Sequence, residues 1–218
     1  MDLALVIGNK NYSSWSLRPW LLLKQAGIPF REIRISLYTA ESRAEIRKYS
    51  PSGKVPALLD DGVTVWESLA IGEYLADKFP EKQFWPSDRV ARAEARCVAT
   101  EMHAGFAALR QHMSMNCRKH LPGKGRTPEA LKDIARISML WNDCRARFGE
   151  GGPFLFGRFS IADAMYAPVA LRFVTYDVAL DPVSATYVKT ITALPAIQQW
   201  VTDARAETEV IPQFEPYA

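Results

Sequence analysis

The spacing of apolar and polar residues over the first eighty positions predicts a small layer of strands and helices. Leu3 to Ile7 is a short, unbroken apolar run, which is typical of a strand buried on both faces. Apolar residues then recur at helical spacing from Trp15 to Ala26, and Gly27 is placed to end that helix. In chain order the pattern predicts a strand at 3–7, a helix at 15–26, a strand at 30–35, a helix at 41–49, two strands within 55–66 joined by the turn Asp60-Asp61-Gly62, and a helix at 67–79.

Beyond about residue 87 the pattern predicts helices only. Thr127 followed by Pro128 is a typical helix start, because Thr caps free N–H groups and Pro fits the first helical position. Ser160 and Asp163 have the spacing of a capping box ahead of a strongly apolar helix. The segment EKQFWPSD separates the two halves, so we predict domains at 1–80 and 87–218. Helices are expected at 87–116 with Ser87 as its cap, at 127–148, after Ser160, at 184–191 and at 195–206.

Composition sets limits without indicating an activity. The chain has 218 residues, of which 48% are hydrophobic and 23% charged, as in ordinary globular proteins. A net charge of +3 is too small to indicate binding to nucleic acid or to an acidic membrane surface. No apolar run is long enough to cross a bilayer and no basic leader precedes the first strand, so we expect a cytoplasmic protein. The three cysteines are far apart, without CxxC spacing or a paired histidine, so we expect neither disulfides nor a metal site.

Two features of residues 55–68 suit a ligand that carries a peptide backbone and an amino-acid head. Pro56 precedes a strand, and a cis peptide bond after Val55 would turn the N–H and C=O of Val55 toward an extended peptide. Glu67 and Ser68 stand where a helix begins, and the free N–H groups and the dipole there favour a carboxylate. Glu67 would take the neighbouring ammonium. The alternative is that Pro56 starts an edge strand and that Glu67 and Ser68 only cap a helix.

Several segments resemble motifs of the cytosolic glutathione transferase family. SPSGKVPALL and ESLAIGEYLADKFP are similar to the glutathione-site signature of that family, and FLFGRFSIADAMYAPV is similar to its capping-box segment. The resemblance implies a thioredoxin-like α/β N-terminal domain plus an all-α C-terminal domain, which is the glutathione transferase fold. It also implies an enzyme of the zeta-like or theta-like serine type, bacterial in appearance, that forms a homodimer. Such an enzyme uses glutathione as co-substrate, needs no metal and acts on a small electrophilic substrate.

The same resemblance implies roles for the residues that match it. Val55 would pair its backbone with the cysteinyl unit of glutathione, and Lys54 would approach the glycyl end. Glu67 and Ser68 would hold the γ-glutamyl group. We assign Ser160 to folding and not to catalysis, because a helix cap contributes about 1 kcal/mol of stability.

Ser13 and Ser14 lie at the predicted start of the first long helix and are the candidates for activating the glutathione thiol. A hydroxyl can donate a hydrogen bond to a sulfur anion while the helix N-terminus adds positive potential. Lowering a thiol pKa by two units takes about 2.7 kcal/mol, which these two effects together can supply. The zeta pattern favours Ser13 and the theta and delta pattern favours Ser14, which we rank first. Tyr12 is a rival because other classes use a tyrosine near this strand end, and plain helix capping is the alternative for both serines.

A second pocket is expected between the two domains for the electrophile. Trp15 stands where the zeta pattern has a cysteine, and Arg172 falls where that class has an arginine that meets an acidic substrate. Because a lone arginine is costly to bury, pairing with a structural carboxylate is the alternative for Arg172. We assign Trp15, Arg172 and Tyr176 to this pocket.

The sequence therefore predicts a glutathione S-transferase that conjugates the glutathione thiol to small electrophiles. Two alternatives stay open. One is a glutathione-dependent isomerase of the maleylacetoacetate isomerase type, and the other is a non-catalytic binding module built on the same fold.

Overall fold

A four-stranded mixed sheet forms the N-terminal part of the chain in the computed structural model, which describes residues 3–217. β1 (Ala4–Ile7) lies parallel to β2 (Arg31–Arg34) and antiparallel to β3 (Ala57–Asp60), and β4 (Val63–Trp66) pairs with β3. The strand order is therefore β2-β1-β3-β4. The interior place of β1 explains its unbroken apolar run, because all four of its residues are buried.

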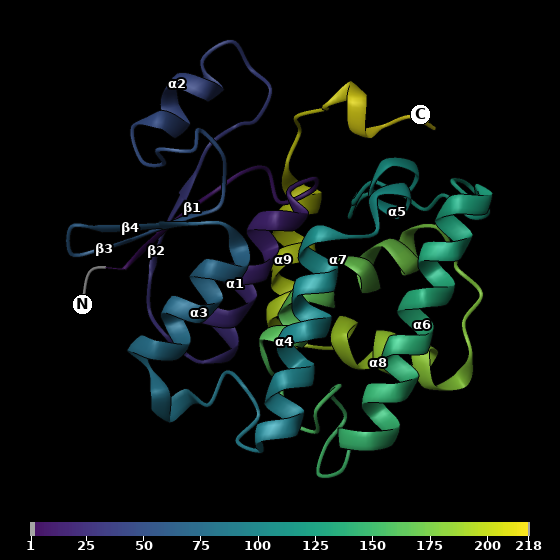
Figure 1. The fold of residues 1–218 in the computed structure, drawn as a ribbon. Helices are drawn as coiled ribbons and strands as arrows, with labels where there is room; N and C mark the ends of the chain where they lie inside the picture. Colours follow the sequence, from purple (N-terminus) through teal and green to yellow (C-terminus); the bar gives the residue numbers. More distant parts are fainter. Residues whose placement is uncertain (1–2, 218) are drawn as a thin grey trace.

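Helices cover both faces of this sheet (Figure 1). α1 (Ser14–Gln25) and α3 (Ser68–Lys78) lie on the face toward the rest of the molecule, and α2 (Ser42–Arg47) lies on the other side. Successive residues of β1 follow this division, because side chains alternate across a strand. Leu5 belongs to the main hydrophobic core with α1 and α3, whereas Val6 packs in a smaller cluster with α2. The small α/β layer predicted from the sequence pattern is confirmed.

The second half of the chain is helical, as predicted. Its central helix, α7, packs against α1 of the first half and against α4 and α8, and Val174 is its one residue that is not buried. No helix within residues 3–217 combines the length and the apolar character that a membrane span needs. The α-helices of this half are α4 (Arg89–Ala104), α5 (Ala107–His112), α6 (Pro128–Phe148), α7 (Ile161–Thr175), α8 (Pro182–Thr192) and α9 (Pro195–Ala206), with short 3-10 helices at Pro80–Lys82 and Pro212–Phe214.

The predicted helix at 87–116 is wrong in two respects. Its cap is Asp88 and not Ser87, because the Asp88 carboxylate accepts from two backbone N–H groups of the first turn. The helix also stops at Gly105, and α5 is a separate short helix. Arg110 of α5 turns back and donates to the carbonyl oxygen of Gly105 at 3.0 Å. A guanidinium thus binds a carbonyl at the end of α4, where the helix itself supplies no partner.

Several local predictions are confirmed. The peptide bond between Val55 and Pro56 is cis, and the turn between β3 and β4 lies where the sequence placed it. Thr127 caps α6 through its side chain. Ser160 and Asp163 form the expected capping box at the start of α7. These features depend on neighbouring residues, which is why the sequence pattern revealed them.

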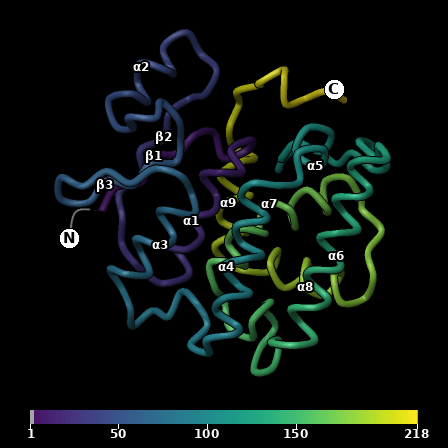
Figure 2. Tube along the Cα trace, viewed as in Figure 1, coloured from purple at the N-terminus to yellow at the C-terminus, as the bar shows by residue number. Residues whose placement is uncertain are grey.

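A C-terminal segment, residues 207–217, runs from α9 past the edge of the sheet and ends beside α5 (Figures 1 and 2). The carboxylate of Glu207 accepts hydrogen bonds from two backbone N–H groups of the loop after β1, at 2.7 and 3.0 Å. Tyr217 donates to the carbonyl oxygen of His112, at the end of α5, at 2.9 Å. The segment therefore joins the two halves of the molecule, and the sequence pattern predicted no element there.

Candidate active site

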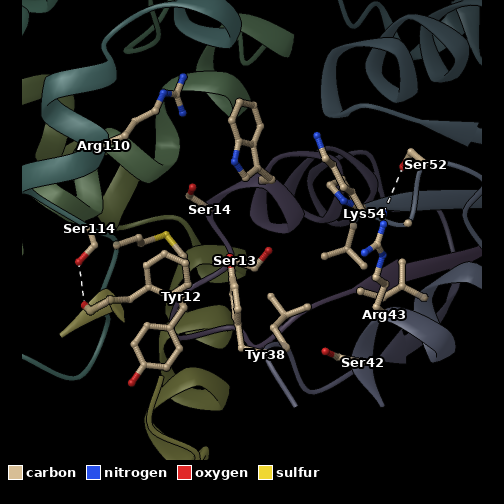
Figure 3. Close-up of a pocket in the computed structure, with 18 of the residues that line it drawn as sticks. Tyr12, Ser13, Ser14, Tyr38, Ser42, Arg43, Ser52, Lys54, Arg110 and Ser114 are labelled. Carbon is tan, nitrogen blue, oxygen red and sulfur yellow. Dashed lines mark hydrogen bonds between the residues drawn. The ribbon is translucent and has the colours of Figure 1, made fainter. Parts of the chain in front are cut away.

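A pocket of about 750 Å³ opens between the sheet half and the helical half of the molecule (Figure 3). The start of α1 lies at its centre, with Arg110 of α5 on one side and Lys54 on the other. Of the residues proposed from the sequence, the pocket is lined by Ser13, Ser14, Trp15, Lys54, Val55, Glu67 and Arg172, whereas Ser68 and Tyr176 are buried and are not among its lining residues.

Ser13 is the N-cap of α1. Its hydroxyl oxygen accepts from the backbone N–H of Ser16 at 3.3 Å and lies 2.7 Å from the Ser16 hydroxyl. The Ser16 hydroxyl in turn accepts from the N–H of Gly8 at 3.1 Å. The Ser13 side chain is therefore part of a chain of hydrogen bonds that fixes the helix start to the end of β1, as helix caps commonly do.

Ser14 is the first residue of α1, and a different element supplies its partner. Its hydroxyl oxygen accepts a hydrogen bond from Nη2 of Arg172, a residue of α7, at 3.2 Å. Only 5% of Ser14 and 4% of Arg172 are exposed, yet both line the pocket. Among residues 3–217, no second side chain bonds to the Ser14 hydroxyl. The proton of this hydroxyl is therefore free to interact with a ligand.

Arg172 does not pair with a carboxylate of the described chain, so the alternative of a buried ion pair is wrong. Its Nε donates to the carbonyl oxygen of Met113 at 2.8 Å, and its Nη1 donates to that of Pro168 at 3.3 Å. Burial, followed by the nearby charge of Arg110, lowers the pKa of the Arg172 guanidinium to about 9. The group is still protonated at neutral pH, so neutral partners hold a positive charge at the wall of the pocket.

Tyr12 is engaged elsewhere, although it also lines the pocket. Its hydroxyl donates to the carboxylate of Glu215 and accepts from Nη2 of Arg118 at 2.6 Å. Burial and the hydrogen bond to Glu215 raise the pKa of Tyr12. Because its proton is bound to a carboxylate of the C-terminal segment, the geometry disfavours Tyr12 as the group that activates a thiol.

The loop before β3 presents open backbone groups. Neither the N–H nor the C=O of Val55 is hydrogen-bonded within the part of the chain that the structure describes. Val55 is half-buried and lines the pocket, so this donor and acceptor are available to an extended ligand. The backbone N–H of Lys54 donates to the Ser52 hydroxyl at 3.2 Å, and the Lys54 side chain is exposed at the rim (Figure 3).

Glu67 and Ser68 stand at the start of α3. The backbone of Glu67 has φ 69° and ψ 126°, a combination that residues other than glycine seldom adopt and that costs on the order of 1–3 kcal/mol. Its carboxylate, half exposed, lies 3.7 Å from Nε2 of His103. Ser68 is almost fully buried, and its hydroxyl accepts from Nη1 of Arg18 at 3.4 Å. Strain of this kind persists where the surrounding structure enforces it, which commonly happens at binding sites.

Trp15 lies close to two guanidinium groups. The Arg18 guanidinium is 4.3 Å from the centre of the indole ring and that of Arg110 is 4.7 Å from it, while the His103 ring meets it edge-on at 5.3 Å. Arg18 is fully buried, and burial lowers its pKa well below the usual value. Cation–π contacts on this scale fix the ring, so Trp15 forms a firm wall of the pocket.

Sequence reasoning missed several residues that line the pocket, and those from the helical half include Arg110, Ser114 and Phe214. The Ser114 hydroxyl donates to the carbonyl oxygen of Phe214 at 2.8 Å, which ties the C-terminal segment to the loop after α5 (Figure 3). Tyr176 stands behind this loop, since its hydroxyl donates to the carbonyl oxygen of Ser114 at 3.1 Å. The one sequence signal for this region is Gly105 itself, because glycine is a poor helix former, and it stands shortly before Arg110.

Both halves of the chain match profiles of a known family. Residues 12–78 match the N-terminal domain of glutathione S-transferases, and residues 87–203 match the C-terminal domain. The chain therefore belongs to the glutathione S-transferase family, and the class of enzyme that its motifs indicated is confirmed.

Individual relatives agree with this assignment. Glutathione S-transferase Z2 of Arabidopsis thaliana is 26% identical over 215 residues, which cover 91% of this chain and 93% of the plant protein. A probable maleylacetoacetate isomerase of Caenorhabditis elegans is 32% identical over 96 residues, which is 44% of each chain. A solved Burkholderia glutathione transferase homolog with bound glutathione superposes with a TM-score of 0.71 at 24% identity, covering 95% of this chain and 100% of the homolog. This last similarity shows the fold alone.

Proposed function

We propose that the protein conjugates the thiol of glutathione to an electrophilic carbon of a small substrate, with Ser14 activating the thiol. The observation that carries the proposal is the position of the Ser14 hydroxyl. It lines the pocket at the N-terminus of α1 and already accepts a hydrogen bond from Arg172, so its own proton is available to a thiolate. Glutathione S-transferases among the relatives support the reaction class.

Glutathione would lie along the sheet side of the pocket. The open backbone groups of Val55 would pair with the cysteinyl unit, and Lys54 would meet the glycyl carboxylate. Glu67 and the free backbone N–H groups at the N-terminus of α3, that of Ser68 among them, would hold the γ-glutamyl group, where the helix dipole favours its carboxylate. The Ser68 hydroxyl itself is buried against Arg18. In this placement the cysteinyl sulfur would lie near the start of α1, as the family pattern implies.

The chemical problem is the protonation of that sulfur, because a free thiol has a pKa of roughly 8.5 and is mostly protonated at neutral pH. The Ser14 hydroxyl and the N-terminus of α1 both favour the anion. The thiolate attacks the electrophilic carbon, a C–S bond forms, and the electron pair leaves with the displaced group. Trp15 and Phe214 offer apolar surface for the electrophile.

A glutathione-dependent isomerase is the second candidate, and a specific observation favours it. Two guanidinium groups, those of Arg172 and Arg110, stand at the pocket and suit an acidic substrate such as maleylacetoacetate. The isomerase relative supports the same reading. In that reaction the thiolate adds to a cis double bond and the adduct rotates about the resulting single bond. The C–S bond then breaks, which expels the glutathione thiolate and re-forms the double bond in the trans geometry.

The test follows the thiolate and the products. Wild-type protein should bind glutathione and show thiolate absorbance at neutral pH. Turnover of a chlorodinitrobenzene would support the transferase, and turnover of maleylacetoacetate would support the isomerase. Ser14→Ala should lower kcat by about 10²-fold with a small change in KM for glutathione, the loss typical of one donor to a reacting anion. Ser13→Ala should chiefly lower stability. Binding without thiolate absorbance would support a non-catalytic module, and loss of thiolate in Ser13→Ala alone would contradict the role of Ser14.

We also propose a cytoplasmic homodimer in which residues 1–80 hold glutathione and residues 87–218 complete the pocket. Exposed apolar side chains on β4 and α4 support a partner subunit: Trp66 is 43% exposed and Val90 53%. In sedimentation velocity experiments the wild type should be a dimer, and Trp66→Glu combined with Val90→Glu should give monomers. Met139→Glu is the matched control, because Met139 is 59% exposed on α6. A wild-type monomer at micromolar concentration would contradict the dimer.

A further inference from the structure

The hydrogen bonds of Arg172 go beyond those needed to anchor its side chain in the fold. Two of its nitrogens bind carbonyl oxygens, those of Met113 at 2.8 Å and Pro168 at 3.3 Å, and these contacts alone would anchor the side chain. The third nitrogen donates to the Ser14 hydroxyl, 158 positions away in the sequence, at 3.2 Å. Within residues 3–217 the three partners of the guanidinium are neutral oxygens, and Ser14 is the one partner residue that lines the pocket.

The direction of this hydrogen bond decides where the Ser14 proton can go. A serine hydroxyl has one proton and can accept through its oxygen, whereas a guanidinium can only donate. The bond from Arg172 therefore occupies the oxygen of Ser14 as an acceptor and leaves its single proton to point elsewhere. Ser13 differs, because its hydroxyl is hydrogen-bonded to the neighbouring Ser16 hydroxyl and to the Ser16 N–H, and it receives nothing from an arginine.

We propose that Arg172 is a positioning residue that acts through Ser14: it fixes the hydroxyl so that the proton is donated to the sulfur of bound glutathione. This inference rests on the proposed function and adds to it a residue of α7 that does not itself touch the sulfur. The guanidinium also polarises the hydroxyl that it binds, which strengthens the donated hydrogen bond.

The groups around Arg172 determine whether the pKa of the glutathione thiol can be measured near neutral pH. Arg110 of α5 and Arg18 of α1 are neighbouring charges, and Tyr176 and Cys117 also face the guanidinium. Burial raises the pKa of Cys117 to about 12 and raises that of Tyr176 above its usual value, so both stay neutral during a titration from pH 5 to 9. The difference in thiolate absorbance between the protein with and without glutathione, which cancels any contribution of the exposed Cys97, therefore reports the sulfur of glutathione.

The decisive measurement is a pH titration of the thiolate absorbance of bound glutathione in a double-mutant cycle. Arg172→Met should raise the thiol pKa by about one unit, a tenfold loss of thiolate at low pH, and Ser14→Ala should raise it at least as much. The double variant should match Ser14→Ala alone, because Arg172 acts through that hydroxyl. Arg145→Met is the matched control, since Arg145 on α6 also binds backbone carbonyls, including that of Gly152 at 2.7 Å, and lies outside the pocket.

Kinetics separate positioning from a merely structural role. In Arg172→Met, kcat should fall at pH 6.5 and recover as the pH rises above the shifted thiol pKa, with little change in KM for glutathione. An equal loss at every pH, or pKa shifts that simply add in the double variant, would overturn the inference. If Arg172→Met does not fold, Arg172→Lys keeps the charge but not the planar fork, and a wild-type thiol pKa there would also overturn it. Absence of thiolate in the wild type would instead contradict the proposed function.

Discussion

Three hydroxyl groups follow one another at the start of α1, and their partners separate their roles. Tyr12 is bound to the C-terminal segment, Ser13 to the first turn of its own helix, and Ser14 to Arg172 of α7. Sequence order cannot choose among them, because all three lie within a single turn. The choice depends on a donor more than 150 positions further along the chain, which is visible only once the two halves are packed together.

Asp163 gives a residue-scale prediction about stability. One carboxylate oxygen accepts from the Leu155 N–H and the Tyr187 hydroxyl, and the other accepts from the N–H and the hydroxyl of Ser160. In Asp163→Asn an amide NH₂ would face donors that need an acceptor. The substitution should lower the free energy of unfolding by roughly 2 kcal/mol or more at pH 7, measured by chemical denaturation. An unchanged denaturation midpoint would contradict this reading of the capping box.

The same residue predicts a pH dependence with a definite sign. Burial raises the pKa of Asp163 to about 6, although four donors oppose the shift. The folded state therefore holds the proton more tightly than the unfolded state, and the free energy of unfolding falls as the pH rises from about 4 to 6. The difference in the free energy of unfolding between wild type and Asp163→Asn should therefore decrease by up to about 3 kcal/mol as the pH rises over that range. Asp181, a cap whose pKa is lowered, should give the opposite sign in Asp181→Asn.

At the scale of elements, features fixed by neighbours in the sequence were predictable and features fixed by packing were not. The cap at Thr127 and the box at Ser160 are encoded within four residues, so the starts of α6 and α7 were predicted. The break between α4 and α5 depends on Arg110 folding back onto the carbonyl oxygen of Gly105. Helical periodicity continues through that break, because the apolar residues on both sides face the same core.

The candidate site shows the same division. Positions that a single motif encodes, such as Val55 with its cis proline, were predicted from the sequence and line the pocket. Arg110 and Phe214 carry no motif and line the pocket because distant segments meet there. The role of each predicted site residue remains a prediction, and the titration of the bound thiol is its most direct test.

At the scale of the whole molecule, the C-terminal segment determines how the pocket ends. Glu207 binds the loop after β1, and Arg34 of β2 forms an ion pair with it at 2.8 Å. Glu215 lies beside Tyr12 and Arg118, which hold the pKa of its carboxylate below the usual value together with other donors. These contacts tie the segment to both halves of the chain, and they hold one of its two aromatic residues against the pocket.

That residue is Phe214, and its position predicts that it affects binding of the electrophile but not the thiol of glutathione. Its ring lines the pocket, 5.9 Å from that of Tyr12 and 5.3 Å from that of Tyr38. Phe214→Ala should raise KM for an apolar electrophile by about 10-fold, as expected when part of an apolar side chain's contact is lost, and should leave the pKa of the bound thiol unchanged. Gln213→Ala, an exposed neighbour in the same 3-10 helix, is the control. A shifted thiol pKa in Phe214→Ala would contradict this prediction. It would mean that the C-terminal segment also affects the environment of the sulfur at the start of α1, so that the two parts of the pocket do not act independently.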